Sequence, residues 1–130
     1  MWAVALVGGF GWAAGRTAGL FDFTTEVGHP TPPRGWEFAL ALVGCLAIGF
    51  TEEMVWRGYL LTRIEALTGS AWQAVALTSL GFGLVHLYQG VGGVINAGLV
   101  GLMCGGAFVA TRRLAAVALA HGAYDLLVMT

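Results

Sequence analysis

The stretch Phe50-Thr-Glu-Glu-Met-Val-Trp-Arg-Gly-Tyr59 places two carboxylates and a guanidinium inside a segment that is otherwise apolar enough to cross a bilayer. At the centre of a membrane helix, each such charge costs roughly 2.5 to 3.5 kcal/mol on insertion scales. Charges at this depth are rare and usually pair with one another or face a polar cavity. We therefore interpret the cluster as a functional site and ask what chemistry it can perform.

The composition around this stretch is typical of a polytopic membrane protein in contact with lipid. The chain has 130 residues, of which 58% are hydrophobic and 10% charged, and its mean hydropathy is +0.79. All six basic residues are Arg and the net charge is −1, so a basic patch for nucleic acid is not supported. Arg without Lys, with abundant Ala and Gly, indicates a GC-rich bacterial coding sequence. We expect the chain in the bacterial cytoplasmic membrane.

The positions of apolar runs and helix breakers predict an all-α transmembrane bundle of about five spans. Residues 1–35 are predicted to form a first span, over 2–21, and a polar loop broken by prolines. Residues 36–130 are predicted to form the core that carries the site. Its helices are expected over residues 36–67, 71–88, 94–110 and 114 to the C-terminus.

Several single residues add detail to the predicted helix boundaries and helix packing. Ser70 is the expected N-cap of the helix that begins at residue 71. Gly101 and Gly105 are spaced by four, which favours close packing of their helix against a neighbour. Cys45 and Cys104 lie within apolar runs and form no spaced pair, so we interpret them as small packing residues.

Most of the Asp, Glu, Arg and His residues in the last four spans belong to three short patterns. These patterns are Glu52-Glu53-x-x-x-Arg57, Phe82-x-x-x-His86 and His121-x-x-x-Asp125. In each pattern a spacing of four puts two residues on one helical face. A lone histidine at the end of a membrane helix is usually an ordinary interfacial residue. The occurrence of all three patterns on three helices favours one shared polar site.

The first pattern predicts different roles for its two carboxylates. Glu53 and Arg57 lie one turn apart and can form an ion pair, which lowers the cost of holding both charges in the membrane. Glu52 points about 100° away around the helix and has no cation on its own helix. We therefore predict that Glu53 and Arg57 are structural and that Glu52 is available as a general base.

The two histidines allow two mechanisms that residue spacing does not separate. In one, Glu52 and one of the two histidines deprotonate a water molecule, and the other histidine with Asp125 orients or stabilises the developing oxyanion of amide hydrolysis. In the other, Glu52, His86 and His121 bind a divalent metal, with an open position for water. We expect Zn²⁺, because zinc prefers oxygen and imidazole ligands of this kind. Neither a His-Glu-x-x-His zinc helix nor a Gly-x-Ser-x-Gly serine elbow occurs in the sequence.

At these three patterns the sequence resembles the CPBP intramembrane proteases, which include type II CAAX prenyl endopeptidases and bacteriocin-processing or bacteriocin-immunity proteins. Motifs of the form Glu-Glu-x-x-x-Arg, Phe-x-x-x-His and His-x-x-x-Asn, each on its own helix, are typical of that family. The resemblance covers about residues 36 to 130 and implies an endopeptidase that acts at or within the membrane. It further implies that Glu52 and His86 activate water, that His121 and Asp125 line the oxyanion site, and that the substrate is a peptide or protein, with lipidated tails among the candidates.

One position departs from the family pattern. Asp125 stands where the family usually has Asn, and an ionised carboxylate cannot donate a hydrogen bond to an oxyanion but can bind a metal. Because a fold does not fix a function, a second class of function stays open. It is a membrane protein without proteolytic activity that confers bacteriocin immunity or binds a partner.

Overall fold

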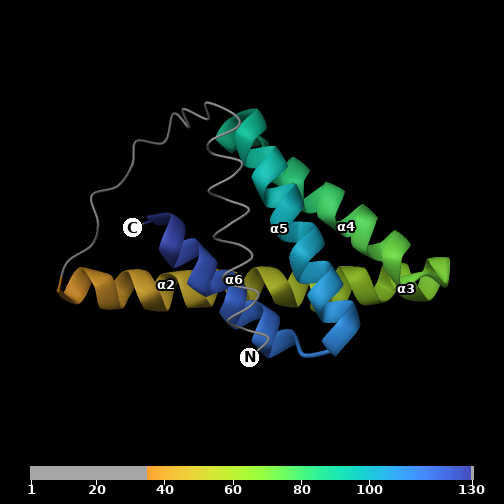
Figure 1. The fold of residues 1–130 in the computed structure, drawn as a ribbon, viewed down its shortest axis with the longest axis horizontal. Coiled ribbons are helices and arrows are strands. Elements are labelled where there is room, and N and C mark those ends of the chain that lie inside the picture. Colours follow the sequence, from red (N-terminus) through yellow and green to blue (C-terminus); the bar gives the residue numbers. More distant parts are fainter. Residues whose placement is uncertain (1–34, 130) are drawn as a thin grey trace.

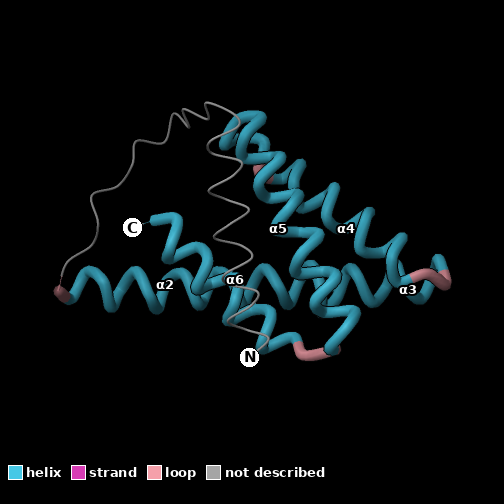
Figure 2. The backbone as a smooth tube through the Cα atoms, viewed as in Figure 1, coloured by secondary structure: helices cyan, strands magenta, loops and turns pink. Residues whose placement is uncertain are grey.

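The computed structural model describes residues 35–129, and every element in that part of the chain is a helix (Figures 1 and 2). The elements in order are α2 (Trp36–Glu53), η1 (Met54–Leu61), α3 (Thr62–Thr68), α4 (Ala71–Val85), η2 (Leu87–Gln89), α5 (Gly90–Thr111) and α6 (Leu114–Met129). The predicted all-α class is therefore confirmed for this part. The span predicted over residues 2–21 lies outside the described residues.

The first three elements run on as one continuous helix over Trp36–Thr68, 33 residues long. It is longer than the roughly 20 residues that a bilayer requires, as the sequence predicts. The helix ends at Gly69, which takes a left-handed conformation with φ of 68°. Ser70 then accepts a hydrogen bond from the backbone N–H of Gln73 at 3.4 Å, so the predicted N-cap of α4 is confirmed.

The helices pack in two close pairs, with α4 along α5 and α6 across α2 (Figure 1). In the first pair, a Cβ built on Gly101 would lie 2.9 Å from the Cα of Ser79. A Cβ built on Gly105 would lie 3.1 Å from a methyl carbon of Val75. The prediction that these two glycines permit close packing is confirmed.

The second pair is held equally close by two further glycines. A Cβ built on Gly49 of α2 would lie 2.6 Å from the backbone nitrogen of Gly122 in α6. A Cβ built on Gly122 would lie 2.7 Å from the carbonyl oxygen of Cys45. The two backbones therefore touch, and this contact brings residue 121 of α6 next to the carboxylates at the end of α2.

The predicted boundary between the helices that begin at residues 71 and 94 is wrong. The third helix was expected to reach residue 88, but α4 ends at Val85, and α5 begins at Gly90 instead of residue 94. The physical reason is His86, whose Nδ1 lies 2.7 Å from the Phe82 carbonyl oxygen that its own backbone N–H would use in a continuing α-helix. That N–H bonds instead to Gly83, which ends the helix.

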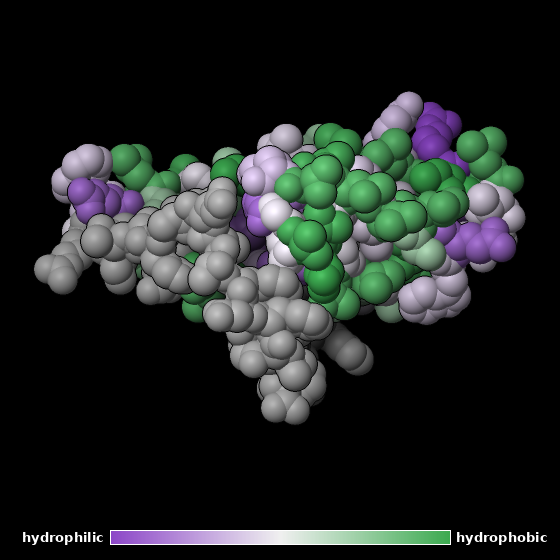
Figure 3. All heavy atoms as spheres, turned by 90° about the horizontal axis from the view of Figure 1, so that it is seen from above, coloured by the Kyte–Doolittle hydropathy of each residue, from purple (hydrophilic) through white to green (hydrophobic). Residues whose placement is uncertain are grey.

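The buried core lies where the four long helices converge, and much of the outer surface is apolar. Figure 3 shows apolar side chains over a large part of one face. Two helices, Trp36–Thr68 and Leu87–Thr111, are long and apolar enough to cross a membrane, while Ala71–Val85 and Leu114–Val128 are apolar but shorter. The core cluster comprises Leu61, Ala74, Val75, Phe82, Ala97, Val100, Cys104, Phe108, Val117 and Tyr124.

Candidate active site

A cleft of about 280 Å³ lies between α2, α5 and α6, beside the end of α4. Four of the six residues predicted from the sequence line it, namely Glu52, His86, His121 and Asp125. Each of the three sequence patterns contributes at least one side chain. The patterns predicted from spacing on separate helices therefore meet at one place.

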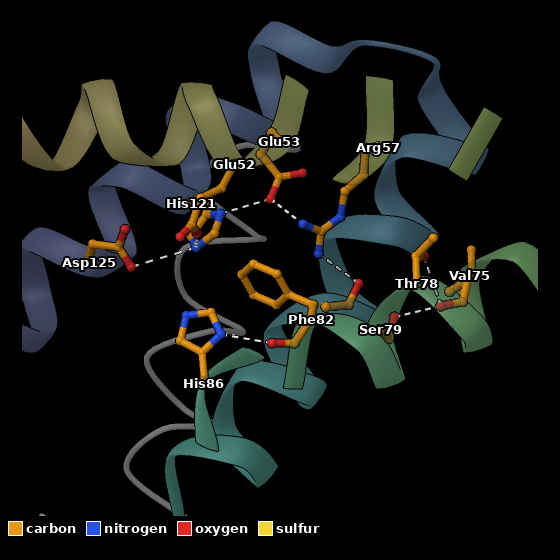
Figure 4. A network of polar contacts seen from close by, with 11 residues as sticks. Glu52, Glu53, Arg57, Val75, Thr78, Ser79, Phe82, His86, His121 and Asp125 are labelled. Carbon is orange, nitrogen blue, oxygen red and sulfur yellow. Dashed lines mark hydrogen bonds and ion pairs between the residues drawn. The ribbon is translucent and has the colours of Figure 1, made fainter. Parts of the chain in front are cut away.

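Glu53 and Arg57 lie behind the cleft wall and are almost completely buried, with exposed fractions of 0% and 1%. Nη1 of Arg57 donates to Oε1 of Glu53 at 2.7 Å, and Nη2 donates to the carbonyl oxygen of Gly101 at 3.0 Å. The same Glu53 oxygen lies 2.7 Å from Nδ1 of His121 (Figure 4). The predicted ion pair is confirmed, and it also ties α2 and η1 to both α5 and α6.

The element η1 is a π-helix, and its wide turns keep the buried residues of this helix on one face. In a π-helix the backbone bonds span five residues, so each turn contains more residues than an α-helical turn. Glu53, Arg57 and Leu61 are spaced by four and all are buried, whereas Met54 and Val55 are exposed. In a regular α-helix, residues spaced by four drift around the axis, because one turn takes 3.6 residues. The π-helical segment therefore keeps Arg57 directed inward behind Glu53.

Glu52 differs from its neighbour in exposure and in partners. Its side chain is 30% exposed, and its Oε2 lies 3.7 Å from Nε2 of His121. Asp125 Oδ1 lies at the same distance, 3.7 Å, from the same nitrogen. Within residues 35–129, His121 is the only ion-pair contact of either carboxylate. Glu52 therefore has no cation on its own helix, as the sequence predicts.

Hydrogen bonds determine which nitrogen of each imidazole carries a proton. Nδ1 of His86 must donate, because the Phe82 carbonyl oxygen can only accept, and so Nε2 of neutral His86 has a lone pair. Nδ1 of His121 likewise donates to the Glu53 carboxylate, which leaves its Nε2 toward Glu52 and Asp125. The Glu53 carboxylate thus orients His121, and the backbone of α4 orients His86.

Phe82 forms the wall that separates the buried ion pair from the cleft. Its ring centre lies 4.7 Å from that of His86 and 5.8 Å from that of His121. Cζ of Arg57 lies 4.9 Å from the same ring centre. The guanidinium therefore gains a cation–π contact in addition to its hydrogen bonds. Figure 4 shows the ring between the side chains of His86 and Arg57, and Phe82 lines the cleft whereas Glu53 and Arg57 do not.

The cleft residues that were not predicted from the sequence include a hydrogen-bonded pair of polar side chains. Asn96 of α5 and Tyr124 of α6 both line the cleft, and the Tyr124 hydroxyl donates to Oδ1 of Asn96 at 3.0 Å. Asn96 is the only carboxamide between Gly90 and Thr111, a span otherwise made of apolar and small residues. That isolated polar side chain in an apolar helix was the signal that could have identified it.

The described residues also bring together a set of metal-type ligand atoms that was not predicted. Glu53, Cys104 and His121 each place one such atom within 4.8 Å of the others. Oε1 of Glu53 already accepts from Arg57 and pairs with His121, whereas its Oε2 is buried without a hydrogen-bond partner among the described residues. The predicted metal ligands Glu52, His86 and His121 all line the cleft with oxygen and nitrogen donor types, but as a set they are not among the described residues whose ligand atoms lie within 4.8 Å of one another. Their role in metal binding stays a prediction.

The fold and the cleft together define a helical membrane protein with a carboxylate and imidazole site in its core. Residues 34–127 match the family described as type II CAAX prenyl endopeptidase Rce1-like. The chain therefore belongs to that family of membrane-embedded proteases, which is the group of proteins that the sequence patterns resemble. No curated protein and no solved structure matches the chain.

Proposed function

We propose that the chain is an intramembrane endopeptidase in which Glu52 and His86 activate a water molecule for attack on a peptide bond. Family membership supports proteolysis in general. The specific observation that supports this assignment is the contrast between the two carboxylates. Glu53 is fully buried and bonded to Arg57 and His121, whereas Glu52 is partly exposed in the cleft. A general base must reach its water, and Glu52 meets that condition.

The proposed reaction begins with water hydrogen-bonded to Glu52 and His86. Nε2 of His86 accepts a hydrogen bond from the water, since its Nδ1 proton is held by the Phe82 carbonyl. Glu52 takes a proton as the water oxygen bonds to the carbonyl carbon, and the π electrons of the carbonyl move to its oxygen. The oxyanion then re-forms the carbonyl double bond as the C–N bond breaks, and the proton passes from Glu52 to the departing amine nitrogen.

His121 is proposed to assist the hydrolysis from its position beside Glu52. Its Nδ1–H is fixed by the buried Glu53 and Arg57 pair, so the imidazole is held before substrate arrives. When Nε2 is protonated it can donate to Glu52, to Asp125 or to the developing oxyanion. If a divalent metal is bound, Glu52, His86 and His121 would hold it, and it would polarise the carbonyl and activate water.

The proposed substrate is a peptide or protein segment at the membrane. The cleft combines the polar groups above with an apolar portion formed by Ile48, Ala97, Val100 and Val128. Such a lining suits a peptide with hydrophobic residues beside the bond that is cleaved. The family description names a prenylated CAAX tail, so a lipidated peptide is the first substrate to test.

The test is cleavage of a peptide library by the protein in proteoliposomes, with the products identified by mass spectrometry. Half of the library is soluble. The other half is farnesylated at a C-terminal Cys-aliphatic-aliphatic-X sequence. The proteins compared are the wild type, Glu52→Gln, and Glu65→Gln as a matched control. Glu65 lies on the same helix, but it pairs with Arg112 and does not line the cleft. We expect cuts with the wild type and Glu65→Gln only. Absence of cuts in both halves, or equal cutting by Glu52→Gln, would contradict the proposal.

A further inference from the structure

Asn96 presents an amide group to the cleft in a defined orientation. It is half-buried, and its Oδ1 accepts the hydroxyl proton of Tyr124 at 3.0 Å. Tyr124 is itself 4% exposed, so this hydrogen bond is held within the protein. With the oxygen occupied, the two N–H groups of Asn96 make no hydrogen bond to any residue in the part of the chain that the structure describes.

The two carboxylates and neutral His86 are poorly suited to donate a hydrogen bond to an oxyanion. Glu52 and Asp125 are acceptors when ionised, and Nε2 of neutral His86 is an acceptor as well. The second carboxamide of the cleft, Gln89, uses one of its two N–H groups to donate to the Tyr88 hydroxyl at 2.9 Å, whereas neither N–H group of Asn96 is used within the described residues. Asn96 therefore supplies the neutral amide donor that the carboxylate at position 125 cannot supply.

We propose that Asn96 is a catalytic residue whose amide N–H groups donate to the carbonyl oxygen of the peptide bond being cleaved. Tyr124 is a positioning residue, because its hydroxyl fixes which end of the carboxamide faces the substrate. This inference rests on the proposed function. It assigns the oxyanion contact to α5, whereas the sequence patterns predicted that contact for His121 and Asp125 of α6.

The contact strengthens as the reaction proceeds. When the water oxygen bonds to the carbonyl carbon, the π electrons move to the carbonyl oxygen, and the N–H donors then face a full negative charge. Hydrogen bonds to an ionised acceptor are shorter and stronger than those to a neutral one. Asn96 is therefore expected to stabilise the transition state more than the bound substrate, and its loss should appear mainly in kcat.

Two substitutions separate donation from structural support. Asn96→Asp keeps an oxygen that accepts from Tyr124 but removes both N–H donors. Tyr124→Phe removes the orienting hydroxyl but keeps the amide. Gln73→Ala is the matched control, since Gln73 is an exposed carboxamide on α4 that does not line the cleft. Each variant is assayed as the full chain in proteoliposomes, using an internally quenched peptide built on the strongest cleavage site of the library described above.

We expect Asn96→Asp and Asn96→Ala to lower kcat by about 100-fold to 1,000-fold with KM nearly unchanged, as for other single oxyanion donors. Tyr124→Phe should lower kcat by a smaller factor, and Gln73→Ala should leave it unchanged. All values are normalised to folded protein by thermal unfolding in detergent. A purely structural role predicts a lower melting temperature for Asn96→Ala and for Tyr124→Phe, with kcat per folded molecule preserved.

The two proposals fail in different ways. If Glu52→Gln is inactive while Asn96→Asp and Asn96→Ala keep wild-type kcat, the role of Asn96 is overturned and the protease assignment stands. If Glu52→Gln cleaves as well as the wild type, or the wild type cleaves nothing, the protease mechanism and the role of Asn96 are both overturned.

Discussion

The contact between α2 and α6 gives the sharpest prediction about how the fold holds the site. Gly122 follows His121, and a Cβ at Gly122 would lie 2.7 Å from the carbonyl oxygen of Cys45. Ordinary contact begins at 3.4 Å, so Gly122→Ala would push the two helices apart by about 0.7 Å. The obstacle is backbone, which cannot move aside as a flexible side chain could. We therefore expect the displacement to be transmitted to His121.

The displacement is large enough to break the hydrogen bond that holds His121. Nδ1 of His121 lies 2.7 Å from Oε1 of Glu53, and moving it by the same amount would give about 3.4 Å, beyond the usual N–H···O range. Overpacking costs roughly 1 to 3 kcal/mol, and a broken buried hydrogen bond costs about 1 to 3 kcal/mol. We expect Gly122→Ala to lower the free energy of unfolding by about 2 to 4 kcal/mol and to reduce kcat by about 100-fold.

The assay is thermal or denaturant unfolding in detergent together with peptide cleavage in proteoliposomes. Gly44→Ala is the matched control, because nothing lies within 4 Å of a Cβ at that position of α2. Replacing a helical Gly by Ala there should be neutral or stabilising by up to about 1 kcal/mol. If Gly122→Ala unfolds and cleaves like Gly44→Ala, the reasoning about the helix contact is refuted.

Three further predictions concern the ion pair, the metal and the helix cap. Arg57→Ala should lower the free energy of unfolding by about 3 to 5 kcal/mol, because Glu53 would be left as an unpaired buried charge; undiminished folded yield in detergent would contradict this. If a metal is bound, His86→Ala and His121→Ala should each abolish stoichiometric zinc measured by mass spectrometry, whereas active wild type purified free of metal would exclude the metal mechanism. Ser70→Ala should lower stability by about 1 kcal/mol while kcat per folded molecule stays constant, and a lower kcat would refute a purely capping role.

Much of the fold follows from local signals in the sequence. Gly69 and Ser70 predict the end of one helix and the start of the next, and the structure confirms both. The spacing of Glu53 and Arg57 predicts their ion pair because it depends on a single helix. The end of α4 was predicted incorrectly, since periodicity gives no sign that the side chain of His86 replaces a backbone donor at Phe82.

The parts of the site that depend on tertiary packing were less predictable. The sequence placed His121 near Glu52, but its closest bond is to Glu53, 68 residues away in the chain. That bond depends on two helix backbones touching at glycines, which spacing within one helix does not reveal. Asn96 was missed because the three patterns were chosen for their ionisable residues, although a lone neutral amide in an otherwise apolar helix is also a signal of a polar site.

The central claim is that Glu52 is the general base for peptide-bond hydrolysis by this membrane-embedded protein. The most direct measurement is kcat per folded molecule for wild type, Glu52→Gln and Glu65→Gln, in proteoliposomes, on the peptide that the wild type cleaves best. We expect Glu52→Gln to retain less than about one part in 1,000 of the wild-type rate, with Glu65→Gln unchanged. Cleavage by Glu52→Gln at a rate close to that of the wild type would contradict the claim.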